Sequence, residues 1–214
     1  MGLFGPTFNY LRPPRATPTE IWAATATASL SHQNQWCLND LHVQPTSEGQ
    51  PGPAKALLEF MATWYRITDM ASLQASYVAE HFTSALPAWT HELTKWIDRG
   101  RMAAIARDRF PHMVDVRVPK LEGWVWVHQL TVVRLAYSTQ IFDRATAGQW
   151  LRPPAQALQR HYGSWEELSD SIAAAREQWN ADVAGRFDDK PLYKHPDSPF
   201  RHVPWSTPLG DPAA

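Results

Sequence analysis

The composition of this 214-residue chain is typical of a folded protein, because 44% of its residues are hydrophobic and 19% are charged. The formal net charge of −1 argues against a general nucleic-acid binder or a membrane-surface protein, since both classes normally carry a basic excess. Eleven Trp and 18 Pro stand beside only 10 Gly. The length favours one domain over residues 1–214, with a packed core.

The cellular compartment is predicted from the number of cysteines and from the lack of a visible targeting signal. Cys37 is the single cysteine, so no internal disulfide can form. Residues 1–10 show no basic region followed by an apolar stretch. The most apolar segment, residues 123–135, contains Arg134 and is shorter than the roughly 20 apolar residues that a bilayer span needs. We therefore expect a cytoplasmic protein with no membrane segment.

The N-terminal half predicts an arm followed by helices. Residues 1–16 have no sustained period and form the predicted arm. Thr17, Pro18 and Glu20 make a capping box with proline at the first helical position, so a helix is expected over 17–31. Apolar residues then recur at helical spacing, which predicts further helices over about 57–64, 70–82 and 84–99. Alternating valines over 114–118 allow one short strand pair.

Three longer helices are predicted in the C-terminal half, over about 121–140, 144–162 and 165–180. The second contains Pro153 and Pro154, where a kink is expected. The third begins with a second capping box, Ser164 to Glu167. Asp69 is a natural cap for the helix that follows it.

From Lys190 the prolines change the prediction. Six of them between Pro191 and Pro212 argue against helix and favour an extended tail. Aromatic residues such as Tyr193 and Trp205 would anchor this tail on the helical body. The fold class is therefore mainly α: a single irregular bundle of about six to eight helices, with room for one short strand pair, wrapped by an extended Pro-rich C-terminal strap over 190–214.

Four segments resemble a known family. They are the run Leu58 to Asp69, the helix with Trp124 and Arg134 to Tyr137, the run Tyr162 to Leu168, and the closing pattern Asp197 to Trp205. Together they look like the bacterial YbeU/YbeR-like family, domain of unknown function 1266. The resemblance implies a predominantly helical fold and no established activity. Some members lie near Rhs-type loci, which implies a role around secreted toxins. Where relatives tend to have Trp-Asp and then Arg, this chain has Trp124, Val125 and His128.

Metal chemistry is the first site hypothesis, because nine histidines are many for this length. The run from His91 to Lys95 has lysine where a zinc hydrolase would have its second histidine. Glu80, His81, His91 and Glu92 could still be assembled by neighbouring helices, although singly hydrogen-bonded histidines are the simpler interpretation. We therefore predict no metal site.

Nucleophilic and nucleotide chemistry also lack their motifs. Cys37 has His32 and His42 five residues away on either side, a spacing that does not share one helical face. Its neighbours, Trp36 and Leu38, favour a small buried hydrophobe instead. No G-x-S-x-G, P-loop or G-x-G-x-x-G sequence occurs. No catalytic residue and no cofactor is predicted.

Charge and tryptophan mark the candidate contact surfaces. Six basic residues and two acidic ones lie between residues 99 and 120, so an anion or an acidic partner surface could bind there. A solvated face whose charge is compensated by acids elsewhere is the simpler interpretation. They are Arg99, Arg101, Arg107, Arg109, Arg117 and Lys120. Periodicity does not fix the place of four tryptophans, and an exposed one would suit an interface. They are Trp36, Trp126, Trp150 and Trp205.

Two functions remain as hypotheses. The first is a non-catalytic, cytoplasmic protein-binding module, immunity-like or accessory to a bacterial secreted-toxin (Rhs/type VI-like) locus, whose partner is a protein such as the cognate toxin. The second is an enzyme or small-ligand protein with a pocket beside the helix over 121–140. That pocket would use His128 and Arg134, with His81 and Glu80 contributed by a neighbouring helix.

Overall fold

The computed structural model describes residues 16–34, 36, 38, 40–43, 54–65, 67–76, 119–179 and 190–210. Helices account for most of these residues, so the prediction of a mainly α fold is confirmed. The candidate strand over 114–118 and nearly all of the N-terminal arm lie outside the described residues. The described helices are α1 (Pro18–Ala26), α2 (Ala28–Gln33), α3 (Ala54–Tyr65), α4 (Met70–Ser76), α7 (Pro119–Ser138), α8 (Arg144–His161), α9 (Trp165–Trp179), α11 (Lys190–Lys194) and α12 (Pro199–His202).

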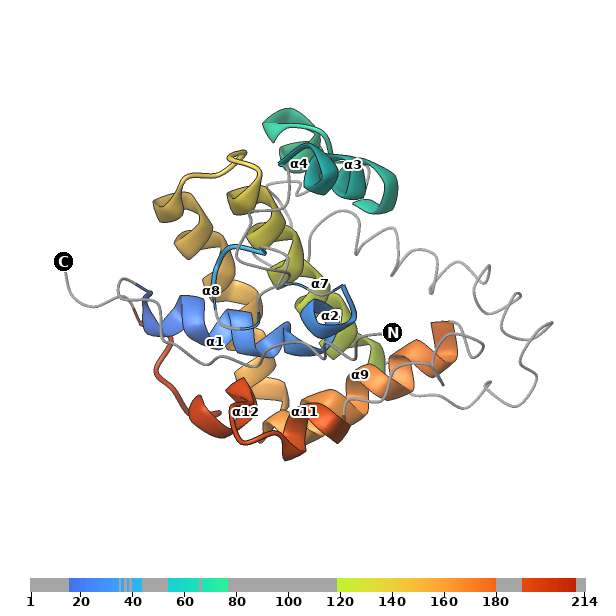
Figure 1. Ribbon diagram of the computed structural model, residues 1–214, viewed down its shortest axis with the longest axis vertical. Helices are drawn as coiled ribbons and strands as arrows, with labels where there is room; N and C mark the ends of the chain where they lie inside the picture. The colour runs from blue at the N-terminus through green and yellow to red at the C-terminus, as the bar shows by residue number, and fades with distance from the viewer. Residues whose placement is uncertain are drawn as a thin grey trace, which may run out of the picture.

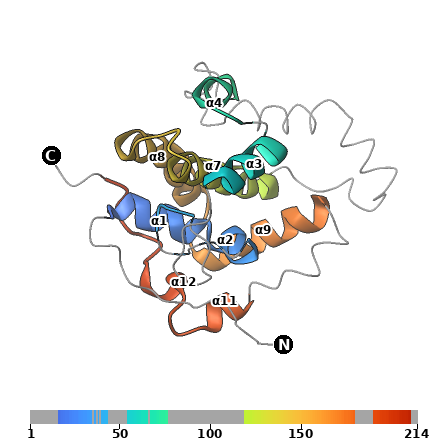
Figure 2. The ribbon, with the colours of Figure 1, turned by 45° about the horizontal axis from the view of Figure 1, so that its top comes forward.

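Helix α7 is the central element of the described part. It packs against α8 and α9, while α1 packs against both α7 and α8 (Figure 1). Residues on several sides of α7 are buried, among them Val127, Leu130, Val133 and Leu135, as expected for a helix that is apolar around most of its circumference. Figure 2 shows α3 and α4 on the opposite side of this body from α11 and α12.

The first helix begins as predicted but ends early. Thr17 Oγ1 accepts from Glu20 N at 3.2 Å, and Glu20 Oε2 accepts from Thr17 N at 2.8 Å, which completes the capping box. The single helix expected over 17–31 is instead two helices, α1 and α2, that meet at Thr27. Thr27 Oγ1 donates to the carbonyls of Ala23 and Ala24. Such bonding back to the preceding turn favours a bend in a helix, and Thr27 lies where α1 and α2 meet.

The predicted starts of two later helices are also found. Asp69 Oδ1 accepts from Ser72 N at 2.7 Å at the start of α4. Ser164 Oγ accepts from Glu167 N at 3.1 Å at the start of α9. The returning carboxylate of Glu167 accepts from Gly163 N rather than from Ser164 N, so this second capping box closes one residue earlier than expected.

Helix α8 is one element from Arg144 to His161 and includes both prolines, Pro153 and Pro154. Asp143 caps it, with Oδ1 accepting from Thr146 N at 2.7 Å. Helix formation across this pair is therefore confirmed, and the kink stays a prediction.

The proline-rich C-terminal region is not extended from Lys190, which corrects the sequence prediction. Pro191 and Pro199 lie in the first turns of α11 and α12. Proline is tolerated there because the first helical turn does not use its N–H groups in intrahelical bonds. Beyond α12 the chain has no further helix up to residue 210, and Val203 and Leu209 are buried against the main core. The prediction that this tail lies on the helical body is confirmed.

Candidate functional site

Arg134 of α7 is a fully buried charged side chain, with none of its surface exposed. Its Nη1 donates to Thr27 Oγ1 and, at 2.7 Å, to Ser31 Oγ. Its Nη2 donates to the carbonyl of Asp40 at 2.7 Å. A buried guanidinium is costly unless its donors are satisfied, and these three bonds offset that cost. Arg134 thereby joins α7 to the α1–α2 junction and to the loop after α2.

His128 lies elsewhere on α7. Its half-buried ring packs against Trp124 with the ring centroids 4.3 Å apart. Six residues turn a helix by about 600°, so His128 and Arg134 point roughly 120° apart around α7. The two side chains therefore have different surroundings. His81 and Glu80 lie outside the described residues, so the predicted ligand site as a whole stays a prediction.

The basic segment expected to bind an anion or a partner cannot be placed as a surface. Arg99, Arg101, Arg107, Arg109 and Arg117 lie outside the described residues. Lys120 belongs to the first turn of α7. This hypothesis stays a prediction.

A second polar connection joins the N-terminal ends of α1 and α8. Glu20 is only 2% exposed and receives two hydrogen bonds from Arg144, Nε to Oε1 at 2.8 Å and Nη2 to Oε2 at 2.7 Å. The hydrogen bond to Glu20 raises the pKa of Arg144 above its ordinary value. Glu20 therefore both caps α1 and holds α8. The sequence predicted the cap but gave no signal for Arg144, which is 124 residues away along the chain.

The residues that follow α12 form a further site, because side chains of α1, α8 and α9 donate hydrogen bonds to their backbone carbonyls. Trp22 Nε1 donates to the carbonyl of Trp205 at 2.9 Å, and Trp165 Nε1 donates to that of Val203 at 2.7 Å. Gln159 Nε2 donates to the carbonyls of Trp205 at 2.7 Å and Thr207 at 2.9 Å. We call residues 203–210 the docked segment, and Trp22, Gln159 and Trp165 the segment-binding residues.

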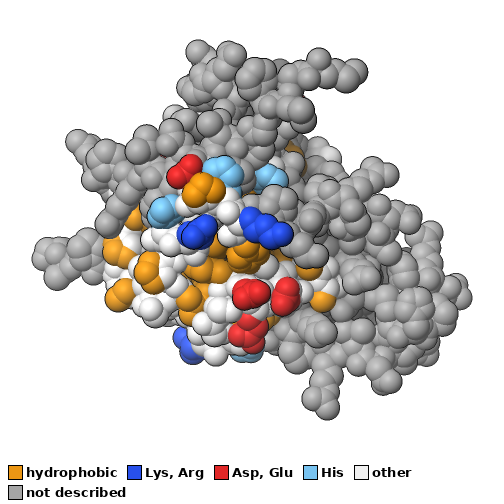
Figure 3. All heavy atoms as spheres, turned by 60° about the horizontal axis from the view of Figure 1, so that its bottom comes forward, with side chains coloured by type: hydrophobic (Ala, Val, Ile, Leu, Met, Phe, Trp, Pro, Cys, Tyr) orange, Lys and Arg blue, Asp and Glu red, His pale blue; other side chains and the backbone are white. Residues whose placement is uncertain are grey.

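Aromatic packing accompanies these hydrogen bonds. The ring centroids of Trp22, Trp165 and Trp205 lie 4.7 to 5.2 Å apart. Phe200 of α12 packs on Trp165 and stacks on Tyr193 of α11. The contact between Trp22 and Trp205 could not be predicted from the sequence. The two residues are 183 positions apart, and helical periodicity gives no information on contacts over that distance. Figure 3 shows hydrophobic side chains at the surface of the described residues, with acidic side chains gathered beside them.

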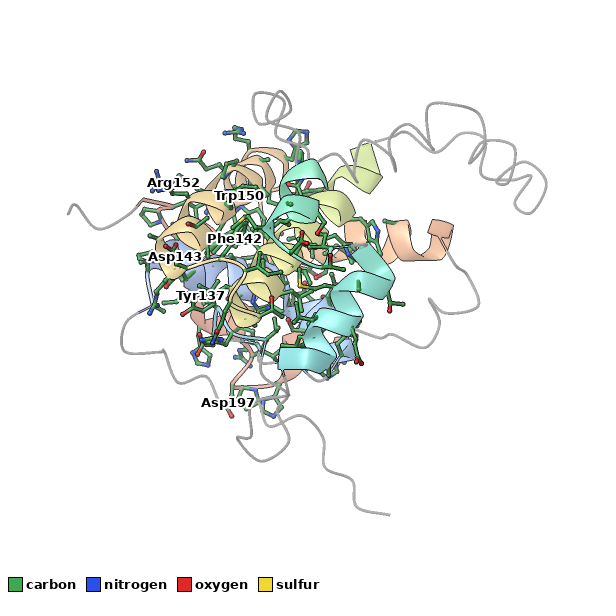
Figure 4. The ribbon with its side chains drawn as sticks, turned by 90° about the horizontal axis from the view of Figure 1, so that it is seen from above. Tyr137, Phe142, Asp143, Trp150, Arg152 and Asp197 are labelled. Atoms are coloured by element: carbon green, nitrogen blue, oxygen red, sulfur yellow. The ribbon has the colours of Figure 1, made fainter. Side chains whose placement is uncertain are left out.

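The outward face of α8 carries a different set of side chains. Gln149 and Arg160 are exposed, and Trp150 is half-buried. The ring of Trp150 packs on Phe142 at 4.8 Å, and Figure 4 shows both on the same side of the molecule as Arg152. No Asp or Glu occurs from Arg144 to His161. Of the four tryptophans whose place was open, Trp150 and Trp205 are half-buried, whereas Trp36 and Trp126 are buried.

Two other kinds of site are absent from the described residues. No group of three or more His, Cys, Asp or Glu side chains among them could hold a metal ion. No helix of the described segments is both long and apolar enough to cross a membrane.

Comparison with known proteins places the chain in a family. A family model described as "Protein of unknown function (DUF1266)" matches residues 19–205, a range that includes Glu20, Arg134, Gln159 and Trp205. No curated protein and no solved structure matches the chain. The match extends over most of the sequence, so the chain belongs to the DUF1266 family.

Proposed function

We propose that this chain is a non-catalytic module that binds another protein through the outward face of α8. We further propose that it is a bacterial YbeU/YbeR-like member of its family and acts in the cytoplasm as an immunity-like or accessory protein of a secreted-toxin locus. The cognate toxin is then its partner.

The observation that carries the proposal is the composition of the α8 face. Gln149 and Arg160 lie together on its exposed side, and the half-buried Trp150 and Arg152 lie on its two opposite flanks. Trp and Arg are the residues most enriched among binding hot spots. The helix has no carboxylate of its own between Arg144 and His161, so its polar surface is basic and neutral. Such a face suits an acidic partner surface, which would also steer association.

The buried polar groups support the non-catalytic part of the proposal. Arg134 is bonded to Thr27, Ser31 and the Asp40 carbonyl, and Glu20 is bonded to Arg144. Each of these bonds links two parts of the chain that are far apart in sequence. These charged groups therefore have a role in holding the fold that accounts for their burial.

A co-expression experiment tests the proposal. The chain is co-expressed with the protein encoded by the adjacent gene, and the affinity of the co-purified pair is measured by calorimetry. The double variant Gln149→Glu/Arg160→Glu, which makes the α8 face acidic, is expected to bind about tenfold more weakly or worse. The control is Arg201→Glu, which makes the same change of an exposed arginine on α12.

Three outcomes would count against the proposal. They are no complex with the neighbouring protein, equal losses in the α8 double variant and the Arg201 control, or an affinity that responds to neither. If His128→Ala rather than the α8 variant abolished binding of a small molecule, the alternative of a ligand site beside α7 would replace it.

A further inference from the structure

The contacts of the docked segment resemble those of a peptide bound to a protein, because side chains of the helical body bind its main-chain carbonyls. Its carbonyls at Val203, Trp205 and Thr207 accept four hydrogen bonds from side chains on three different helices. The donors are Trp22 of α1 and Gln159 of α8, together with Trp165 of α9. Recognition of main-chain groups gives affinity without regard to sequence, whereas pockets for individual side chains give specificity.

Specificity is supplied by the side chains of the segment. Val203 and Leu209 are buried against the main core. Trp205 lies between them in sequence and packs edge-on against both Trp22 and Trp165. Tryptophan is among the residues most enriched at binding hot spots, so we take Trp205 as the anchor of the segment.

The segment is also suited to bind as a separate piece. Pro204 and Pro208 fix two of its φ angles, so less conformational entropy is lost on docking. The segment contains a turn whose hydrogen bonds are formed within the segment itself, since Thr207 N and Thr207 Oγ1 both donate to the carbonyl of Pro204. The described backbone hydrogen bonds within it are thus local, and its hydrogen bonds to the body come from side chains of the body.

We propose that the segment-binding residues are a peptide-recognition site that the chain's own docked segment occupies reversibly, and that the same segment of a second copy of this chain can take its place. The argument for that occupant is identity of sequence, since a second copy presents the same carbonyls and the same Val203, Trp205 and Leu209. Exchange of an identical element between copies is a low-cost route to a dimer. Gln159 of α8 belongs to this site, but Gln149 and Arg160, which the test of the proposed function alters, are not segment-binding residues.

The test uses full-length chains and a labelled peptide that copies residues 198–210. In the Trp205→Ala chain the resident segment loses its anchor, so the site is open to the peptide. We expect the peptide to bind this chain at least about tenfold more tightly than the wild-type chain, whose site is filled. A peptide carrying Trp205→Ala should bind neither chain. The control chain is Ser206→Ala, which alters an exposed neighbour and should behave as the wild type.

A second measurement keeps the proposal falsifiable should the Trp205→Ala chain not fold. Hydrogen exchange of the wild-type chain is expected to show the indole N–H groups of Trp22 and Trp165, which donate to carbonyls of the docked segment, exchanging more easily than the backbone amides of α7, as for a unit that opens separately. Exchange of both kinds of group only by global unfolding would overturn the proposal. So would a folded Trp205→Ala chain that does not bind the peptide. If no partner protein bound to α8, the peptide-binding and hydrogen-exchange results would not change, so the two proposals can fail independently.

Discussion

At the scale of single residues, Gly123 shows how closely two helices approach. A Cβ at this position of α7 would lie 2.5 Å from Tyr162 Oη and 3.2 Å from Leu168 Cδ1. Tyr162 Oη accepts a hydrogen bond from Gly123 N and also bonds to Ser171 Oγ, so it cannot move without breaking both bonds. Glycine is therefore required by space, and helix propensity alone would favour alanine.

We predict that Gly123→Ala destabilises the protein by about 1–3 kcal/mol, the usual cost of overpacking a filled site. Urea unfolding monitored by circular dichroism measures this free energy. Gly148→Ala is the matched control, because no atom lies within 4 Å of a Cβ added there in α8. That control should gain up to about 1 kcal/mol from helix propensity. Similar changes in the two variants would refute the steric explanation.

Arg134 and Glu20 show where prediction at this scale stops. The sequence placed Arg134 on the central helix but could not reveal that its guanidinium reaches Thr27 and Ser31, more than 100 residues earlier. Glu20 was expected from its spacing to Thr17, and that local bond is present. Its bonds to Arg144 are not local and were not expected. Spacing reports a side chain's neighbours within one turn, whereas tertiary partners depend on the packing of whole helices.

At the scale of elements, the starts of the helices could be predicted from the sequence. Whether a proline prevents helix formation depended on its position in the element. The caps at Thr17, Asp69 and Ser164 use a side-chain oxygen and an amide three residues later, so a short sequence pattern is sufficient. The prolines after Lys190 predict extended structure. Pro191 and Pro199 instead begin short helices, because proline in a first turn costs no intrahelical bond.

The cap of α8 makes a prediction about pH. Thr146 N donates to Asp143, and this bond lowers the pKa of the Asp143 carboxyl below its ordinary value of 3.8. A lowered pKa in the folded state means that the cap contributes its full stability above 3.8 and loses it as pH falls through the lower value. Asp143→Asn keeps an oxygen acceptor but does not titrate.

We therefore expect the wild-type chain to have the higher Tm at neutral pH and the difference from Asp143→Asn to shrink as pH falls below 3.8. Thermal unfolding over a series of pH values measures both. Asp69→Asn provides a parallel case, because the hydrogen bonds from Ser72 lower the pKa of Asp69 in the same way at the start of α4. A Tm difference independent of pH would show that the carboxylate charge does not contribute to either cap.

At the scale of the whole molecule, the mainly α class followed from periodicity, but the joining of the chain's two ends did not. Trp205 near the end was predicted to anchor the tail, and Trp22 near the start lies in the helix predicted after Thr17. Their contact, and the bond from Trp22 Nε1 to the Trp205 carbonyl, arise only once α1, α8 and α9 have packed together. The docked segment is thus bound by residues of α1, α8 and α9, which lie far apart along the chain.

This arrangement predicts a particular non-additivity. The Trp205 carbonyl accepts from both Trp22 Nε1 and Gln159 Nε2, so either donor alone keeps it bonded. Trp22→Phe and Gln159→Ala should each lower the free energy of unfolding only a little through this carbonyl, because one donor remains. The double variant leaves the carbonyl without either donor. We expect the double variant to lose about 1 kcal/mol more than the sum of the two single losses in free energy of unfolding.

The matched control is the cycle of Trp165→Phe with Gln159→Ala, in which ring size changes identically. Trp165 Nε1 donates to the Val203 carbonyl, whereas Gln159 donates to the carbonyls of Trp205 and Thr207. These two residues do not share an acceptor, so their effects should add within about 0.5 kcal/mol. Urea unfolding of the singles and doubles gives both coupling energies. Equal coupling in the two cycles would mean that the docked segment responds as one packed unit, and the shared carbonyl would have no special role.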